Sequence, residues 1–244
     1  MNVEAYGVLY KVEKEHWWTR VRARLLRLLV KRYFIHSGNL KILDVGCGTG
    51  LNSKLLESFG TVYSLDVSEE ALRFCSEQRL KNLYRGEANS LPFGDGNFDL
   101  VIALDVFEHL KDDQGATQEI KRVLKPGGIF ICFVPAFSFL WSAHDEYLMH
   151  QRRYDKKSLE ALFVSGWTKN KVSYFNFFLF PPIVFMRFII KLFKLKDKDS
   201  FERLSTLNAV FYAIFKAELP LLRLIDFPFG VSLLAVYQKN TEVV

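Results

Sequence analysis

The sequence has few cysteines and no paired cysteine motif. Its three cysteines, Cys47, Cys75 and Cys132, lie far apart and form no C-x-x-C pair. Such a set argues against a disulfide framework and a cysteine zinc site, and is typical of reduced thiols. His144 and His150 are too sparsely accompanied by acidic residues for a metal site. The sequence therefore predicts no bound metal.

The sequence also lacks a segment suited to export or to crossing a membrane. Residues 1–10 include Glu4 and no apolar run of signal-peptide length. The longest uncharged stretch near the Phe-rich region, residues 172–186, falls short of the about 20 residues that a spanning helix needs. There is no internal repeat or low-complexity tract. We therefore expect a cytoplasmic protein, with peripheral membrane contact left open.

The composition is that of a folded chain with a basic segment. The 244 residues are 50% hydrophobic and include 23 Phe, which excludes disorder for most of the length and suits one α/β domain with an added cap. The net charge is +6. Residues 11–32 alone hold eight Lys or Arg and two Glu. Nucleic acid, an anionic membrane or a solvated helix face would each explain this basic segment.

The chain is organised around residues 41–50, with the sequence KILDVGCGTG. A short apolar run stops at Gly46, Gly48 and Gly50, and a helical pattern opens at Leu51, which predicts a strand, a tight loop and a helix. Glycine permits backbone angles closed to other residues and lets a ligand approach main-chain N–H groups. The spacing is G-x-G-x-G, and differs from the G-x-G-x-x-G of dinucleotide-binding loops. An ordinary turn is the alternative interpretation.

Two carboxylates beside this loop favour a positively charged nucleoside ligand. Asp44 precedes the first glycine by two residues, where it would repel a pyrophosphate and attract an ammonium or sulfonium group. S-adenosylmethionine (SAM) carries both groups. Asp66 ends the next apolar run, where it would accept hydrogen bonds from two ribose hydroxyls.

Three further motifs follow in order along the chain. They are GEANSLPF at residues 86–93, FDLVIALDVFEHL at 98–110 and RVLKPGG at 122–128. With the glycine loop, this series resembles the class I SAM-dependent methyltransferases, in particular the ubiquinone/menaquinone-biosynthesis-like branch (methyltransferase type 11). The resemblance is strong over about residues 40–135. It implies SAM as cofactor, S-adenosylhomocysteine as product, and methyl transfer to a small-molecule or lipid-like acceptor.

The resemblance also implies roles for individual residues. Trp18 and Arg24 would belong to an N-terminal lid, in which an aromatic closes the pocket and an arginine pairs with the methionine carboxylate. In the family an Asp is common where this chain has Glu87, which leaves that role uncertain. The cofactor-binding set implied is Trp18, Arg24, Asp44, Gly46, Cys47, Gly48, Gly50, Asp66, Val67, Glu87, Ala88 and Leu104. A solvated helix with its tryptophans in the core is the alternative for the N-terminal segment.

The expected fold is an α/β, Rossmann-like, seven-stranded and mostly parallel sheet with helices on both faces. The predicted strands span residues 42–45, 62–66, 83–85, 98–104, 129–134, 167–174 and an antiparallel 230–238. The predicted helices span 11–33, 52–59, 68–78, 117–124, 156–165, 183–195 and 201–224. The chain is expected to be a single methyltransferase domain, with an N-terminal helical lid (11–35), a core (36–175 and 226–239) and a helical cap (176–225). Helix 183–195 either caps the acceptor pocket or lies in a membrane interface.

Candidate catalytic groups are His109, His144, His150 and Tyr154. A base is needed only if the acceptor is a hydroxyl, an acidic carbon or a protonated amine. Structural hydrogen bonds are the alternative role for Glu108 and His109. The pair Arg152 and Arg153 would bind an anionic acceptor or belong to an ordinary surface loop.

Three functions are compatible with these patterns. Methylation of a small or lipid-like molecule is the leading hypothesis. A noncatalytic membrane-surface or partner-binding protein of the same fold is the alternative. RNA methylation is weaker, because no RNA-binding module is recognisable and residues 104–107 read LDVF where an Asn-Pro-Pro-Tyr-type motif would stand. A nucleic-acid partner is therefore not favoured, and the oligomeric state is left open.

Overall fold

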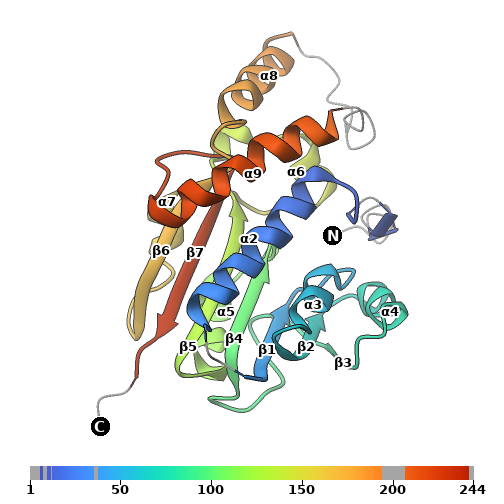
Figure 1. The fold of residues 1–244 in the computed structure, drawn as a ribbon, viewed down its shortest axis with the longest axis vertical. Helices are drawn as coiled ribbons and strands as arrows, with labels where there is room; N and C mark the ends of the chain where they lie inside the picture. The colour runs from blue at the N-terminus through green and yellow to red at the C-terminus, as the bar shows by residue number, and fades with distance from the viewer. Residues whose placement is uncertain (1–5, 8–9, 12, 36–37, 194–206, 242–244) are drawn as a thin grey trace.

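The computed structural model describes residues 6–7, 10–11, 13–35, 38–193 and 207–241, which contain one seven-stranded sheet (Figure 1). Its strands lie in the order β3-β2-β1-β4-β5-β7-β6. Strand β7 is antiparallel to both of its neighbours, and the other neighbouring pairs are parallel. The strands are β1 Leu40–Val45, β2 Gly60–Asp66, β3 Asn82–Arg85, β4 Phe98–Leu104, β5 Leu124–Pro135, β6 Trp167–Phe175 and β7 Ser232–Lys239. The predicted fold class is confirmed, including the antiparallel last strand.

Helices connect and cover these strands. They are α2 Trp17–Tyr33, α3 Leu51–Leu56, α4 Glu69–Glu77, α5 Asp113–Val123, α6 Ala143–Tyr147, α7 Lys156–Glu160, α8 Phe180–Leu192 and α9 Asn208–Leu224, with 3₁₀ turns η1 Phe107–His109 and η2 Ser138–Leu140. Helices α2 and α9 lie side by side across one face of the sheet (Figure 1). Strand β1 sits between β2 and β4, so the strand order reverses beside it. Open α/β sheets bind ligands at such a point, outside the carboxyl ends of the strands.

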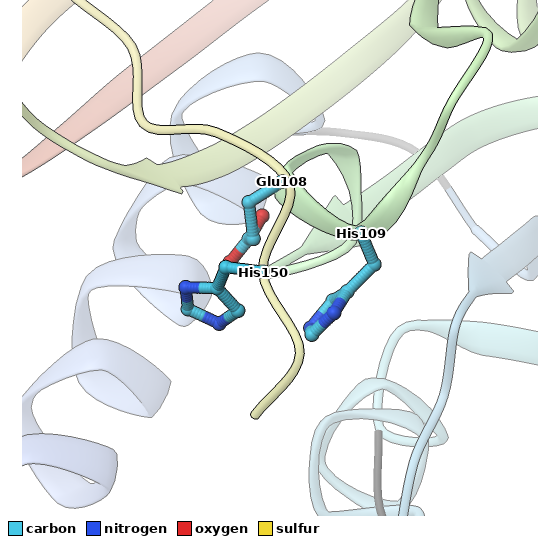
Figure 2. A group of neighbouring side chains, drawn as sticks. All are labelled: Glu108, His109 and His150. Atoms are coloured by element: carbon cyan, nitrogen blue, oxygen red, sulfur yellow. The ribbon is translucent and has the colours of Figure 1, made fainter. Parts of the chain in front are cut away.

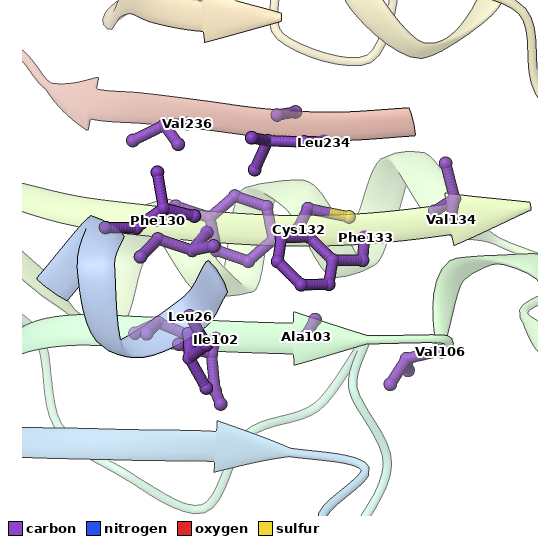
Figure 3. Close-up of a cluster of buried hydrophobic side chains, with 14 of the residues drawn as sticks. Leu26, Ile102, Ala103, Val106, Phe130, Cys132, Phe133, Val134, Leu234 and Val236 are labelled. Carbon is purple, nitrogen blue, oxygen red and sulfur yellow. The ribbon is translucent and has the colours of Figure 1, made fainter. Parts of the chain in front are cut away.

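The central strands are buried on both faces along most of their length, as their mainly apolar sequences predict. Figure 3 shows Ile102 and Ala103 of β4 beside Phe130, Cys132 and Phe133 of β5, with side chains of β7 beyond them. Helix α2 contributes apolar side chains to the same core from the outside of the sheet. This packing fixes the carboxyl end of β4, on which the candidate site is built.

The start of α4 agrees with its sequence signal. Ser68 is the N-cap, and its hydroxyl accepts a hydrogen bond from the Ala71 N–H at 3.3 Å. Glu69 and Glu70 follow in the first turn, where negative charge stabilises the helix dipole. Helix α5 begins four residues earlier than predicted, because Asp112 caps it by accepting from the Gly115 N–H at 2.8 Å.

Other predicted boundaries also differed. The helix before residues 125–128 ends at Val123, within one residue of the prediction, but β5 starts at Leu124 rather than Ile129, and its Leu124 pairs with Phe98 before a register shift. Helix α7 ends at Glu160 rather than Ser165. Helix α8 starts at Phe180, before the two prolines, because proline is tolerated in the first helical turn, where its missing N–H is not needed.

Helices α8 and α9 follow β6 and lie at the carboxyl end of the sheet (Figure 1). Predicted helical residues 194–195 and 201–206 fall outside the described residues. Glu218 of α9 is fully buried and accepts hydrogen bonds from the N–H groups of Phe177 and Phe178, at 2.8 and 3.4 Å, which attaches α9 to the chain leaving β6. Within the described residues, no helix combines the length and apolar character needed to cross a membrane.

Candidate functional site

The glycine loop after β1 has the backbone geometry that its sequence requires. Gly46, Gly48 and Gly50 have φ values of +69°, +55° and +89°, in the left-handed region that favours glycine. A Cβ at Gly46 would lie 2.5 Å from a methyl of Val106 at the end of β4. A Cβ at Gly48 would meet no atom within 4 Å. The first glycine therefore allows close packing, and the second leaves open space beside the loop.

Several main-chain N–H groups of this loop bond within the protein, in contrast to the expectation that they face a ligand. The N–H groups of Gly46 and Cys47 donate to the Leu65 carbonyl at 2.7 and 3.0 Å. The Gly48 N–H donates to Oδ2 of Asp66 at 2.9 Å. The glycines thus supply close approach, and these three donors hold the loop against β2.

Asp66 connects the glycine loop to the start of α4. Its side chain is nearly buried, and its second oxygen accepts from the Ser68 N–H at 2.9 Å. Burial raises the pKa of Asp66, and the two backbone donors oppose that rise. Since each carboxylate oxygen can accept more than one hydrogen bond, both retain acceptor capacity.

A cavity of about 450 Å³ opens at the carboxyl ends of β1, β2 and β4. This volume lies in the range of sites for small molecules and cofactors. Residues of the predicted cofactor set that line it are Gly46, Gly48, Asp66, Val67, Glu87 and Ala88. Other lining residues are Tyr6, Val45, Leu65, Gly86, Asn89, Asp105, Val106, His109, Leu110, Lys111 and Asp112.

The remaining predicted cofactor residues do not line this cavity. Asp44 is buried beneath the loop and accepts a hydrogen bond from the Ser53 hydroxyl at 2.6 Å. Burial raises its pKa to about 7. The Cys47 sulfur lies 3.6 Å from the Cys75 sulfur, and a Cβ at Gly50 would lie 2.9 Å from the Cys75 sulfur. Asp44, Cys47 and Gly50 therefore pack against the protein interior and hold the loop in place.

The N-terminal helix presents different residues from those expected. Trp18 stacks on Phe175 at 6.1 Å between ring centroids, and Arg24 is exposed, away from the cavity. Arg22 instead forms an ion pair with Asp105, a cavity residue with a φ of +57°. Arg22 follows Trp18 by one helical turn, which places both on one face of α2. The four-residue spacing from Trp18 is the sequence feature that could have indicated Arg22 in place of Arg24.

Of the catalytic candidates, only His109 lines the cavity. Burial, and then the neighbouring His150 ring, lower the pKa of His109 to about 4, so this imidazole is neutral at physiological pH. Tyr154 is buried, with its hydroxyl 2.7 Å from Asp113, and both effects raise its pKa. His144 lies on α6, outside the cavity lining.

The two arginines beside Tyr154 are paired with acidic side chains. Arg152 bonds Asp113 at 2.8 Å, and Arg153 bonds Asp145 at 2.7 Å. Neither arginine lines the cavity. This geometry favours a structural role for the loop over binding of an anionic acceptor.

Glu108, His109 and His150 lie together although they are far apart in sequence (Figure 2). Glu108 and His109 come from the turn after β4, and His150 comes from the segment after α6. Their potential ligand atoms all lie within 4.8 Å of one another. The prediction of no metal site considered His144 and His150 with their sequence neighbours, and so missed this cluster.

The chain has clear relatives in sequence. Residues 43–132 match the family model described as "Methyltransferase domain". A curated relative, the demethylmenaquinone methyltransferase of Staphylococcus aureus (strain MRSA252), is 34% identical over 124 residues, which are 45% of this chain and 52% of the relative. The chain thus spans about half the length of the curated relatives it matches.

Solved structures share the fold along nearly the whole chain. A chain from the complex between the Haloferax volcanii Trm112 methyltransferase activator and its "putative methyltransferase" superposes with a TM-score of 0.64 and 19% sequence identity, and the match covers 97% of this chain and 95% of that one. The [4+2]-cyclase SpnF superposes with a TM-score of 0.59 and 21% sequence identity, and the match covers 92% of this chain and 83% of that one. At these identities the likeness shows the fold alone. The family match thus identifies residues 43–132 as similar to a methyltransferase domain, and the solved structures show that this chain shares their fold.

Proposed function

We propose that this protein transfers a methyl group from SAM to a small-molecule or lipid-like acceptor. The observation that carries the proposal is the cavity at the strand-order reversal, lined on one side by Gly48 and Asp66 and on another by His109. The first two suit a nucleoside with free ribose hydroxyls. The third is a neutral imidazole that can accept a proton.

The chain's residues fit SAM in the following way. Asp66 would accept hydrogen bonds from the ribose, and Gly46 and Gly48 would allow the ligand to approach the loop closely. Val67, Glu87 and Ala88 would contact the adenine, and Leu104 is assigned to the same side. Asp44 and the support residues Cys47 and Gly50 act through the loop, and Asp44 contributes negative potential toward the methionine end. Trp18 and Arg24 remain predicted lid residues, with Arg22 as the arginine of α2 that reaches a cavity residue.

When bound, SAM would supply a methyl group attached to a sulfonium sulfur, and this sulfur is the leaving group and becomes a neutral thioether. The protein has mainly to align the acceptor with that methyl and to exclude water. Alignment of this kind lowers barriers by about 7 to 11 kcal/mol. If the acceptor is a hydroxyl or acidic carbon, His109 is placed to take its proton, because it lines the cavity and is neutral. His144, His150 and Tyr154 lie outside the lining.

The cap supports a lipid-like acceptor. No described side chain of α8 is buried, and Phe185 and Phe188 are 67% and 60% exposed. Lys191 lies on the same helix. An exposed apolar helix with basic residues suits the interface of an anionic membrane. We propose that α8 touches the membrane while the rest of residues 1–244 acts as one methyltransferase domain with lid, core and cap.

Incubation with SAM labelled in its methyl group tests the function, with lipid, metabolite and RNA fractions of the source cell separated afterwards. We expect label in the lipid or metabolite fraction and loss of transfer in Asp66→Ala. Label only in RNA would refute the proposed acceptor class.

The alternative is a noncatalytic membrane-surface or partner-binding protein, which the exposed face of α8 motivates. Flotation with anionic liposomes separates the two. Flotation without affinity for SAM would favour the alternative. Flotation together with SAM affinity would support a methyltransferase that works at a membrane.

A further inference from the structure

The turn after β4 holds a buried carboxylate that has no hydrogen-bond partner within the described part of the chain. Glu108 is 1% exposed, and neither of its carboxylate oxygens has a partner among the described residues. A buried, unpaired carboxylate is costly unless it is protonated or lies beside a cation. The nearby Arg22 and Arg153 are already bonded to Asp105 and Asp145. Burial accordingly raises the pKa of Glu108.

The imidazoles of His109 and His150 lie beside the Glu108 carboxylate. Nδ1 of His109 is buried and has no partner among the described residues. The His109 and His150 rings meet edge to face, with centroids 4.7 Å apart. The backbone holds the two segments together, since the Gln151 N–H donates to the Glu108 carbonyl at 2.7 Å. The cluster is therefore a fixed feature of the fold.

His150 is oriented by a buried acid behind it. Its Nδ1 lies 2.9 Å from Oδ1 of Asp145, which is fully buried and also bonded to Arg153 at 2.7 and 2.9 Å. Arg153 donates to both oxygens of Asp145, so this carboxylate is the hydrogen-bond acceptor in the cluster. Nδ1 of His150 then donates to it, which leaves Nε2 of His150 with a lone pair. This acid–histidine arrangement is common behind metal ligands.

We propose that Glu108, His109 and His150 bind a divalent transition-metal ion at the edge of the cavity. One carboxylate and two neutral imidazoles suit a first-row ion such as Zn²⁺ rather than Mg²⁺ or Ca²⁺, which prefer oxygen ligands. Ligand atoms at about 2.1 Å in a tetrahedral site lie about 3.4 Å apart, so the widest pair here has to close by about 1.4 Å.

Three protein ligands leave a coordination position open, and His109 places it toward the cavity. This step rests on the proposed function and replaces His109 as the base in it, because an imidazole lone pair held by the metal cannot also take a proton. A hydroxyl oxygen of the acceptor would occupy the open position and lose its proton to water, because the metal lowers the pKa of that hydroxyl. The new bond joins this oxygen to the methyl carbon. The bond between methyl and sulfur breaks, and its electron pair stays on sulfur. The inference thus names an oxygen acceptor.

The test uses the tag-free full chain, stripped of metal by a chelator and titrated with Co²⁺ alone and then Zn²⁺ alone. We expect about one Co²⁺ per chain, with the visible absorption of a low-coordinate nitrogen and oxygen site, displaced by Zn²⁺. Glu108→Gln and His150→Gln should each weaken binding at least about tenfold. His144→Gln, in the same connecting segment but outside the cluster, should bind as the wild type does.

Binding of S-adenosylhomocysteine to each variant is measured in parallel and reports on the fold and the cofactor cavity separately. A wild-type chain that binds this ligand but neither metal would overturn the metal site and leave the proposed function standing. Metal affinity unchanged in both Glu108→Gln and His150→Gln would overturn it as well. Metal binding without S-adenosylhomocysteine binding would instead contradict the proposed function.

Discussion

Replacing Asp66 by Ala removes the group that joins the glycine loop, α4 and the cavity. In the wild type its two oxygens accept from the N–H groups of Gly48 and Ser68, each at 2.9 Å. The proposed cofactor contact adds ribose hydroxyls to the same oxygens. Leaving such buried groups unpaired costs about 1 to 3 kcal/mol. We therefore expect affinity for S-adenosylhomocysteine to fall by about 5- to 150-fold.

Isothermal titration calorimetry measures this affinity directly. Asp99→Asn is a matched control, because Asp99 also accepts from a backbone N–H, that of Lys41 at 2.8 Å, and pairs with Lys125 at 2.6 Å, yet lies outside the cavity lining. The control should bind with wild-type affinity. Unchanged affinity in Asp66→Ala, with the protein folded, would refute the assignment of Asp66 to the ribose.

Further predictions concern the loop, its buried acid and the cap. Gly48→Ala should weaken S-adenosylhomocysteine binding and cost only the about 1 to 2 kcal/mol of strain of a left-handed alanine, because its Cβ meets no atom within 4 Å. Gly46→Ala should lower the melting temperature further, because its Cβ would also lie 2.5 Å from a methyl of Val106. Equal loss of stability in the two variants would be inconsistent with this division. Burial raises the pKa of Asp44 to about 7, so this side chain gains its negative charge as the pH rises from about 6 to about 8. Over that range the affinity for SAM, divided by the affinity for S-adenosylhomocysteine, should increase in the wild type. A ratio that is equally flat in the wild type and in Asp44→Asn would contradict this prediction. Burial raises the pKa of Glu218 from its usual 4.5 to about 7, so its contribution to stability is full below about pH 4.5 and is lost as the pH rises through 7. In denaturant unfolding, Glu218→Gln should remove up to about 3 kcal/mol of this pH-dependent loss of stability. Parallel pH profiles of stability in the wild type and the variant would argue against this prediction.

The parts of the fold that the sequence predicted well are those with local signals. The run from Phe98 to Leu104 is apolar except for Asp99, and the structure gives it the same bounds as β4. Ser68 with two following acids predicted the start of α4. The glycine spacing likewise located the loop. In each case the physical cause lies within a few residues, so the pattern can be read without a tertiary structure.

The parts that the sequence missed depend on contacts between distant segments. Tyr6 lines the cavity, where burial and the Asp66 carboxylate raise its pKa to about 12. Nothing in its local sequence indicates that placement. Glu108 and His150 likewise meet only because the segment after α6 folds back onto the turn after β4. Helix α5 ends just before residues 125–128, as their sequence predicts, but the early start of β5 depends on the pairing of Leu124 with Phe98 of β4.

The central claim is that the cavity beside β1 holds a sulfur nucleoside. Titration of the purified chain with S-adenosylhomocysteine and, separately, with NAD tests it most directly. The account predicts saturable binding of S-adenosylhomocysteine at one site per chain and much weaker binding of NAD, because the loop spacing and Asp44 disfavour a pyrophosphate. Tighter binding of NAD, or binding of neither ligand, would contradict it.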